Sequence, residues 1–248
     1  MSRKKTAILT GCNGEVGLKV SEKLFLNDFN VIGIDVTNKR NQYLQKYFQF
    51  DLRELSNDSS GAKVKFISDV EETLGHSGVD LLINNAAIQK IDSIKTITST
   101  SWKDVMEVNF YSAVFLSQII LPYLNKGASI INVSSIHSKL TKPGFLSYAT
   151  SKGALSSFTR NLAIDLEGIA RVNAIEPAAI DTKMLRDGFK DKNISIEDLK
   201  DFHPTKCIGT TDEIADLIIC LSSGSFKFLN GSCIEVSGGI SSRLHDPV

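Results

Sequence analysis

The sequence predicts a single-domain α/β protein, with a doubly wound parallel sheet of about seven strands and helices on both faces. Short apolar runs alternate with longer amphipathic segments along the whole chain. Most of these runs are continuously apolar, which indicates strands buried on both faces, as in parallel sheets. No Pro/Gly/Ser-rich linker or internal repeat divides the chain, so we expect residues 1–248 to form one domain.

The predicted strands are the seven runs Ala7–Thr10, Val31–Ile34, Tyr47–Phe50, Leu81–Ile83, Ile130–Val133, Val172–Ile175 and Cys233–Val236. The segments between them have helical periodicity. For example, Val16, Val20 and Leu24 fall on one helix face. A helix predicted over residues 102–125 is apolar on more than one face, so it is either deeply buried or part of a subunit interface.

The composition excludes several classes of protein. Lys plus Arg and Asp plus Glu number 28 each, so the chain lacks the basic charge of a nucleic-acid-binding protein. The four cysteines have no metal-ligand spacing and are expected to be free thiols in a reducing compartment. No secretory segment and no run of membrane-spanning length is apparent. We therefore expect a soluble cytoplasmic protein with no metal and no membrane partner.

A glycine-rich loop, Gly11-Cys12-Asn13-Gly14-Glu15-Val16-Gly17, joins the first predicted strand to the first predicted helix. Without Cβ atoms the backbone can turn tightly and approach a pyrophosphate, and the helix N-terminus offers free N–H groups to the phosphates. Taken alone, such a loop also fits an ordinary turn. Its position after the first strand favours a dinucleotide-binding Rossmann fold.

Asp35 ends the second predicted strand, 18 residues beyond Gly17. A carboxylate at this place accepts hydrogen bonds from the ribose hydroxyls of NAD and repels the 2′-phosphate of NADP. Lys39 and Arg40 follow shortly after, but no basic residue lies in the glycine-rich loop. An Asp at the end of a strand is common and need not bind a ligand. After a glycine-rich loop of this kind, however, Asp35 favours NAD over NADP.

Tyr148 and Lys152 are four residues apart, which places them one turn apart on the same face of a helix. A nearby ammonium favours the phenolate, so Lys152 is expected to lower the pKa of Tyr148 and make it an acid-base group. The same spacing is common by chance on protein surfaces. Ser134 and Ser135 strengthen the interpretation, because they follow a buried strand at the edge where open α/β sheets bind ligands. A serine pair at a strand end also fits a helix cap.

Over essentially its whole length the chain resembles the short-chain dehydrogenase/reductase family. The matching segments are the Gly11–Gly17 loop, Asp51-Leu52, Asn84–Ala87, Asn109, Ser135, Tyr148, Lys152, Asn173–Pro177, Leu229–Gly231 and Ser237–Gly239. The resemblance implies an NAD-dependent oxidoreductase that interconverts a secondary alcohol and a ketone by hydride transfer.

The resemblance also implies a role for each matching residue. Ser135 would polarise the substrate oxygen, Tyr148 would transfer the proton, and Lys152 would lower the tyrosine pKa and hold the nicotinamide ribose. Asn109 would fix a water that links Lys152 to solvent. The implied cofactor-binding residues are Gly11, Asn13, Gly14, Glu15, Val16, Gly17, Asp35, Asp51, Leu52, Asn85, Ala86, Ala87, Tyr148, Lys152, Pro177, Ile180 and Thr182.

Three positions depart from the family pattern. Glu15 stands where the short branch of the family has its second glycine, which gives the loop the TGxxGxxG spacing of the longer sugar-nucleotide branch. Ala87 and Ala178 stand where glycine is usual. The chain length and the Ser237-Gly238-Gly239 segment resemble the short branch, so we expect the cofactor to be retained.

The substrate pocket is expected from Gln89, Lys90, His137 and Glu176, together with Ser135 and Tyr148. These side chains would make a polar pocket, which favours a hydroxylated or sugar-like substrate, although His137 also fits a surface loop. Residues 182–207 are rich in Lys and Asp and lack a regular pattern. They fit either a solvated excursion or a lid over the ligand crevice.

Two other functions remain open at this point. A non-catalytic dinucleotide-binding regulator would keep the fold, but it would not need Ser135, Tyr148 and Lys152. A sugar-nucleotide epimerase or dehydratase fits the loop spacing, but usually needs a larger substrate domain. The resemblance further implies a homo-oligomer, a tetramer or dimer, that pairs through the apolar helix at 102–125 and the helix at 148–166.

Overall fold

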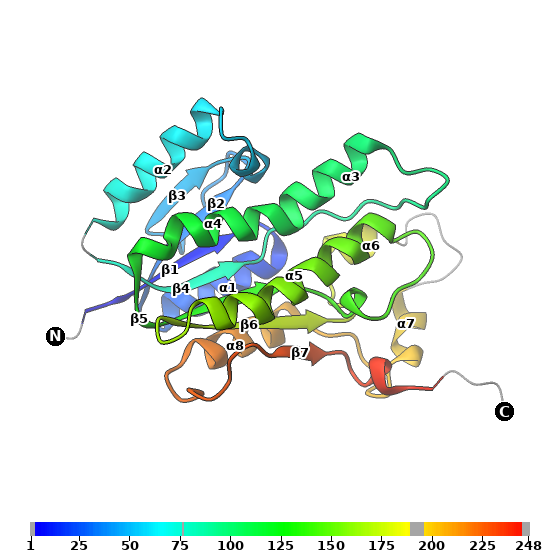
Figure 1. Cartoon of the computed structure of the whole chain (residues 1–248). Coiled ribbons are helices and arrows are strands. Elements are labelled where there is room, and N and C mark those ends of the chain that lie inside the picture. The colour runs from blue at the N-terminus through cyan, green and yellow to red at the C-terminus, as the bar shows by residue number, and fades with distance from the viewer. Residues whose placement is uncertain (1–2, 76, 189–195, 245–248) are drawn as a thin grey trace.

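The computed structural model describes residues 3–75, 77–188 and 196–244. One sheet of parallel strands runs in the order β3-β2-β1-β4-β5-β6-β7 (Figure 1). The strands are β1 (Lys5–Thr10), β2 (Phe29–Asp35), β3 (Lys46–Gln49), β4 (Val79–Asn84), β5 (Leu124–Val133), β6 (Ala170–Pro177) and β7 (Cys233–Val236). Each predicted apolar run overlaps one of these strands, so the predicted fold class is confirmed.

The sheet reverses its strand order beside β1, which pairs with β2 on one side and β4 on the other. The chain first builds β2 and β3 outward in one direction and then β4 to β7 in the other. At such a reversal the connections leave the carboxyl edge in opposite directions, and a crevice opens between them. The glycine-rich loop follows β1 at this point.

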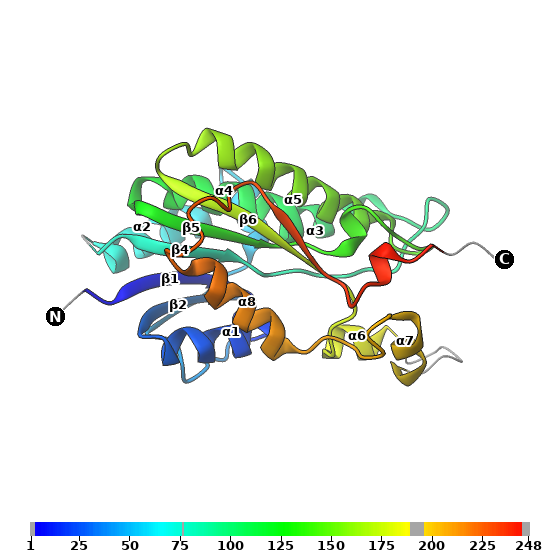
Figure 2. The same ribbon diagram turned by 90° about the horizontal axis from the view of Figure 1, so that it is seen from below.

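Helices cover both faces of the sheet (Figure 2). On one face lie α1 (Glu15–Leu26) and α8 (Thr211–Ser222); on the other lie α2 (Gly61–Leu74), α4 (Ser112–Ile120) and α5 (Leu146–Asp165). Alternate residues of β1 serve the two cores: Leu9 packs in the core of α1 and α8, and Ile8 in the core of α2 and α4. Burial on both faces explains why the strands are continuously apolar.

The long apolar helix has a different internal structure from the one predicted. It consists of α3 (Ser99–Met106), a π-helical turn η2 (Glu107–Tyr111), α4 and a short 3₁₀ turn η3 (Leu121–Tyr123). It ends before Asn125, because β5 begins at Leu124. Within the described residues, 99–123 are long and apolar enough to cross a membrane, so the expectation of no such run was wrong. Half of the apolar 18-residue window within this run is buried, and the run packs against the sheet and α5, as in a core helix.

Residues 182–207 are more regular than predicted where the structure describes them. They contain α6 (Lys183–Asp187), begun by the Thr182 hydroxyl accepting from Leu185 N, and α7 (Ile196–Phe202). Residues 189–195 lie outside the described part. Both helices lie beyond the carboxyl end of β6 (Figure 1). The remaining short turns are η1 (Leu52–Ser56), η4 (Ile136–Ser138) and η5 (Ile240–Ser242).

Candidate active site

A cavity of about 1390 Å³ lies along the carboxyl edge of the sheet. It is larger than a typical small-ligand site and has room for a dinucleotide together with a substrate. Every predicted cofactor-binding residue lines it, as do Gln89, Ser135 and His137. Two residues that were expected at the site, Asn109 and Glu176, do not line it.

At two of the three loop glycines, a larger residue would clash with neighbouring backbone atoms of the protein. A Cβ on Gly17 would lie 2.0 Å from the Gly11 carbonyl oxygen, which no side chain can tolerate. Gly11 has φ +64°, and a Cβ there would lie 2.9 Å from the Ala86 Cα. Gly14, at the N-cap of α1, has no such close contact. The loop is therefore folded tightly, with the N-terminus of α1 facing the cavity.

Glu15 has a role that the sequence did not indicate. Its carboxylate accepts hydrogen bonds from the backbone N–H of Lys183 and from the guanidinium of Arg186. Arg186 also pairs with Asp181, at 2.5 Å. The residue that replaces the usual glycine thus joins the first turn of α1 to α6, and both Glu15 and Lys183 line the cavity.

Asp35 is held at the end of β2 by the neighbouring backbone. Its carboxylate accepts from Asn13 N at 3.0 Å, and from the N–H and hydroxyl of Thr37 at 3.0 and 3.1 Å. Arg40 is turned away, since its guanidinium donates to the carbonyls of Leu44 and Gln45. Neither Lys39 nor Arg40 lines the cavity. The cavity therefore presents a fixed carboxylate at the end of β2.

Further along the cavity, Asp51 forms an ion pair with Arg53 at 2.6 Å, and the hydrogen bonds from Arg53 hold the pKa of Asp51 below its usual value. Arg53 also pairs with Asp104. The backbone of Asn85 and Ala86 is anchored by N–H bonds to the Thr10 hydroxyl, both 3.0 Å. These contacts fix two further parts of the cavity wall.

Ser135 and Tyr148 meet at the other end of the cavity. Ser135 follows β5 and begins the turn η4, where its hydroxyl accepts from His137 N at 3.2 Å. Tyr148 lies in the first turn of α5, within hydrogen-bonding reach of the Ser135 hydroxyl. In the protein alone, burial raises the pKa of Tyr148, while the Ser135 hydrogen bond acts in the opposite direction.

Lys152 follows one turn later on α5 and is only 2% exposed. Its ammonium donates to the Val133 carbonyl at 2.8 Å and lies 5.7 Å from the centre of the Tyr148 ring. Burial lowers the pKa of Lys152 to about 7. The sequence predicted a lowered tyrosine pKa; in the protein alone, the lysine pKa is lowered and the tyrosine pKa is raised.

Asn109 lies in the π-helical turn η2 and clamps the segment after β4. Its side-chain oxygen accepts from Ile88 N at 2.8 Å, and its amide donates to Ile88 O and to the Ser151 hydroxyl, both at 3.0 Å. Ile88 lines the cavity, and Ser151 immediately precedes Lys152. Asn109 therefore joins two parts of the site from behind the cavity wall.

Aromatic packing organises the pocket around His137. Its ring stacks on Phe145 with centroids 4.6 Å apart and meets the Tyr148 ring edge-on at 5.7 Å. Burial, with the nearby Lys142 charge, lowers the pKa of His137 to about 4, so the ring is neutral at pH 7. Phe145 was not among the residues predicted from sequence. Gln89 and Lys90 line the cavity as expected, but Glu176 does not, and its predicted place in the pocket was wrong.

Comparison with known proteins identifies this arrangement. A family model described as enoyl-(acyl carrier protein) reductase matches residues 16–241. The 3-oxoacyl-(acyl-carrier-protein) reductase FabG of Buchnera aphidicola subsp. Schizaphis graminum is 31% identical over 249 residues, covering 96% of this chain and 97% of that protein. The chain belongs to the short-chain dehydrogenase/reductase family.

Two solved structures share the fold. One is a short-chain dehydrogenase family protein from Francisella tularensis, 28% identical, with a TM-score of 0.85, covering 98% of this chain and 100% of that one. The other is aldohexose dehydrogenase of Thermoplasma acidophilum in ligand-free form, 24% identical, with a TM-score of 0.89, covering 99% and 97%. Members of the short-chain dehydrogenase/reductase family bind a nicotinamide dinucleotide, which the tight glycine-rich loop fits.

Proposed function

We propose that this chain is an NAD(H)-dependent oxidoreductase that interconverts a secondary alcohol and a ketone, with Tyr148 as general acid and base. The main support for the proposal is that one cavity is lined by both the proposed catalytic residues and the proposed cofactor-binding residues. Ser135, Tyr148 and Lys152 line one end of it, and the glycine-rich loop and Asp35 line the other.

The chain's own groups fit a nicotinamide dinucleotide. The compact loop brings the N-terminus of α1 to the cavity, where its free N–H groups suit a pyrophosphate. Asp35 would hold the adenosine ribose, Asp51 and Leu52 the adenine, and Lys152 the nicotinamide ribose. Ile180 and Thr182 would hold the carboxamide. When bound, the nicotinamide supplies or accepts the hydride.

The residues at the other end would handle the proton. In reduction, Ser135 donates a hydrogen bond to the substrate carbonyl oxygen, and Tyr148 passes its phenolic proton to that oxygen as an alcohol forms. In oxidation, the phenolate takes the same proton back. A positive charge near the phenol, from Lys152 or from the oxidised nicotinamide, offsets the effect of burial on the tyrosine pKa. Asn109 would hold the water that returns the proton to solvent.

Replacing Asp35 with Ser should shift cofactor preference toward NADP by about tenfold or more, because it removes a carboxylate that repels the 2′-phosphate. The measurement is the ratio of kcat/KM for NADH and NADPH. Asp51→Asn is the matched control: Asp51 lines the same cavity, and its loss should weaken both cofactors alike. An unchanged ratio in Asp35→Ser would show that Asp35 does not select NAD.

For the substrate, we propose a polar, hydroxylated or sugar-like molecule, bound by Gln89 and the neutral ring of His137. The described parts of residues 182–207, which contain α6 and α7, would cover it as a lid. The FabG relative favours a second candidate, the reduction of a 3-oxoacyl group. NADH absorbance recorded with a panel of polyols, sugars, simple alcohols and a 3-oxoacyl thioester tests the function and separates the two. Turnover of hydrophobic ketones alone would refute the polar substrate, and a chain that binds NAD without turnover would fit a regulator.

We also propose a homotetramer, assembled through the apolar run at 99–123 and α5. Exposed apolar side chains on these elements include Leu121 and Ile164. Sedimentation at micromolar concentration should give a species of about four chains, and a monomer would refute the proposal. All four cysteines are free thiols, which fits a cytoplasmic protein; cell fractionation tests that location.

A further inference from the structure

A buried carboxylate lies directly behind the proposed catalytic residues. Glu176 is the penultimate residue of β6 and is fully buried. Adjacent residues of a strand point to opposite faces, so Pro177 lines the cavity while Glu176 faces away from it. A charge in this position is unfavourable unless it is paired and hydrogen-bonded. Its partners therefore indicate what it is for.

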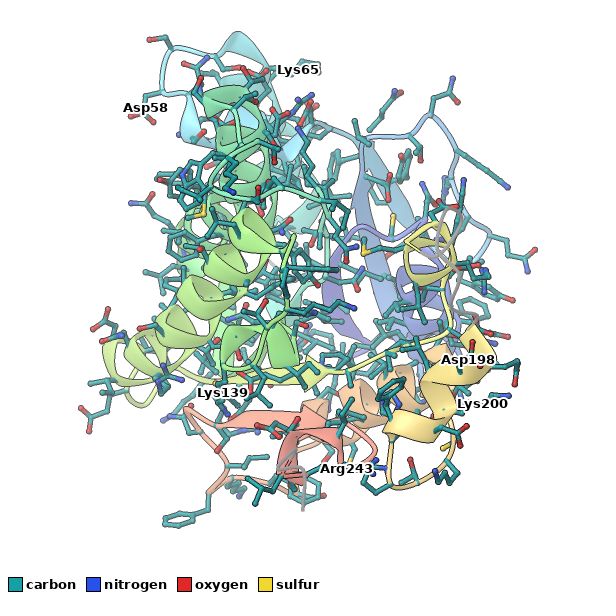
Figure 3. The ribbon with its side chains drawn as sticks, turned by 90° about the vertical axis from the view of Figure 1, so that its right-hand side faces the viewer. Asp58, Lys65, Lys139, Asp198, Lys200 and Arg243 are labelled. Carbon is teal, nitrogen blue, oxygen red and sulfur yellow. The ribbon has the colours of Figure 1, made fainter. Side chains whose placement is uncertain are left out.

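The carboxylate contacts the two elements that carry the proposed catalytic groups. Its Oε1 accepts from the Ser138 hydroxyl, in η4, at 2.8 Å and from the Ser156 hydroxyl, in α5, at 2.7 Å. Its Oε2 lies 3.0 Å from the Lys139 ammonium and has no further partner among the described residues. Lys139, which is labelled in Figure 3, also pairs with Glu235 on β7 at 3.2 Å.

The same network continues to Lys152. The Ser156 hydroxyl, which donates to Glu176, lies 2.8 Å from the Ser134 hydroxyl. The Ser134 hydroxyl in turn donates to the Lys152 carbonyl at 3.0 Å. Burial raises the pKa of Glu176, but the two hydroxyls and Lys139 outweigh it and leave the pKa below its usual value. The group is therefore an anion at neutral pH.

We propose that Glu176 is a positioning residue for catalysis. Its carboxylate holds the turn η4, which Ser135 caps, in a fixed position relative to α5, which carries Tyr148 and Lys152. Glu176 touches neither substrate nor cofactor, and it acts through Ser138 and Ser156. The expected effect on kcat rests on the proposed function. The expected ordering of η4 by Glu176 does not, and it can be measured separately.

The decisive variant is Ser138→Ala, which cuts the link between Glu176 and η4 and removes only one half-buried hydroxyl. Misplacing Ser135 by a fraction of an ångström should lower kcat about tenfold and leave the KM for NADH unchanged, because the cofactor loop is not involved. Glu176→Leu, which removes both links, should lower kcat by about a hundredfold. Glu176→Gln keeps an acceptor at Oε1 and should restore kcat to within about threefold of wild type.

Glu235→Gln is the matched control, because it removes a carboxylate from the same Lys139 without touching η4 or α5. It should leave kcat unchanged. A purely structural role for Glu176 predicts a different pattern: Glu176→Leu would lower kcat only in proportion to its unfolded fraction in a thermal melt, and Ser138→Ala would be silent. Either that pattern or an equal loss in Glu235→Gln would overturn the proposal.

Hydrogen exchange gives a readout that needs no substrate. The backbone amides of Ser138, Lys139 and Leu140 close the turn η4 by donating to the carbonyls of Ser135 and Ile136. They should exchange faster in Ser138→Ala and Glu176→Leu than in wild type, with β1 and α1 unaffected. If no compound is turned over, the proposed function fails while the exchange data still decide whether Glu176 orders η4. Unchanged exchange at η4 would refute the positioning role.

Discussion

Tyr148→Phe should abolish turnover in both directions and leave the fold intact. The variant loses one hydroxyl, and the ring keeps its edge-on contacts with His137 and Phe145. General acid-base groups contribute about 10²–10⁴-fold, so kcat should fall by that factor. NADH absorbance with the best compound of the panel measures the loss.

Tyr43→Phe is the control for this prediction, because Tyr43 does not line the main cavity and contacts Glu22. It should behave as wild type. NADH binding to Tyr148→Phe, followed by its effect on thermal stability, should be retained, because the cofactor loop and Asp35 are untouched. A variant that keeps more than about a tenth of wild-type kcat would exclude Tyr148 as the proton donor.

Lys152→Met should stabilise the cofactor-free protein at and below neutral pH while abolishing activity. Burial lowers the pKa of Lys152 from its ordinary 10.5 to about 7. Between these values the unfolded chain binds more protons than the folded one, so wild-type stability rises with pH across this window. Below pH 7 the folded protein carries the buried charge, and its removal should raise the free energy of unfolding by up to about 5 kcal/mol.

Urea denaturation from pH 6 to pH 9 tests this prediction. The difference between Lys152→Met and wild type should be largest at pH 6 and should shrink as the pH rises, because the wild-type lysine loses its proton. Replacing the exposed Lys126 with Met serves as the control. If the free energy of unfolding varied with pH in the same way in Lys152→Met and wild type, burial would not destabilise the charged form of Lys152.

The fold was predictable because each strand is recognisable from a short stretch of neighbouring residues. Strands buried on both faces are continuously apolar, as Ile8 and Leu9 illustrate by packing in opposite cores. The site was predictable where spacing fixes geometry: Tyr148 and Lys152 share a helix face, and Ser135 follows a central strand.

The rest depended on tertiary contacts that carry no local signal. Glu15 is far in sequence from Arg186, and nothing in either segment indicates that they pair. Glu176 was expected to contribute to a polar pocket, but strand alternation turns it to the other side. The expected fall in the tyrosine pKa ignored burial, which acts on both Tyr148 and Lys152 and opposes the charged form of each.

The two edge strands of the sheet also bear on how the chain behaves when it is concentrated. β3 and β7 have four residues each, whereas the interior strands have six to ten. An edge strand exposes unpaired backbone groups that can template the addition of a foreign strand. Short edges expose few of them. A sheet with long, largely buried inner strands therefore ends on both sides in strands that offer few backbone groups to a foreign strand.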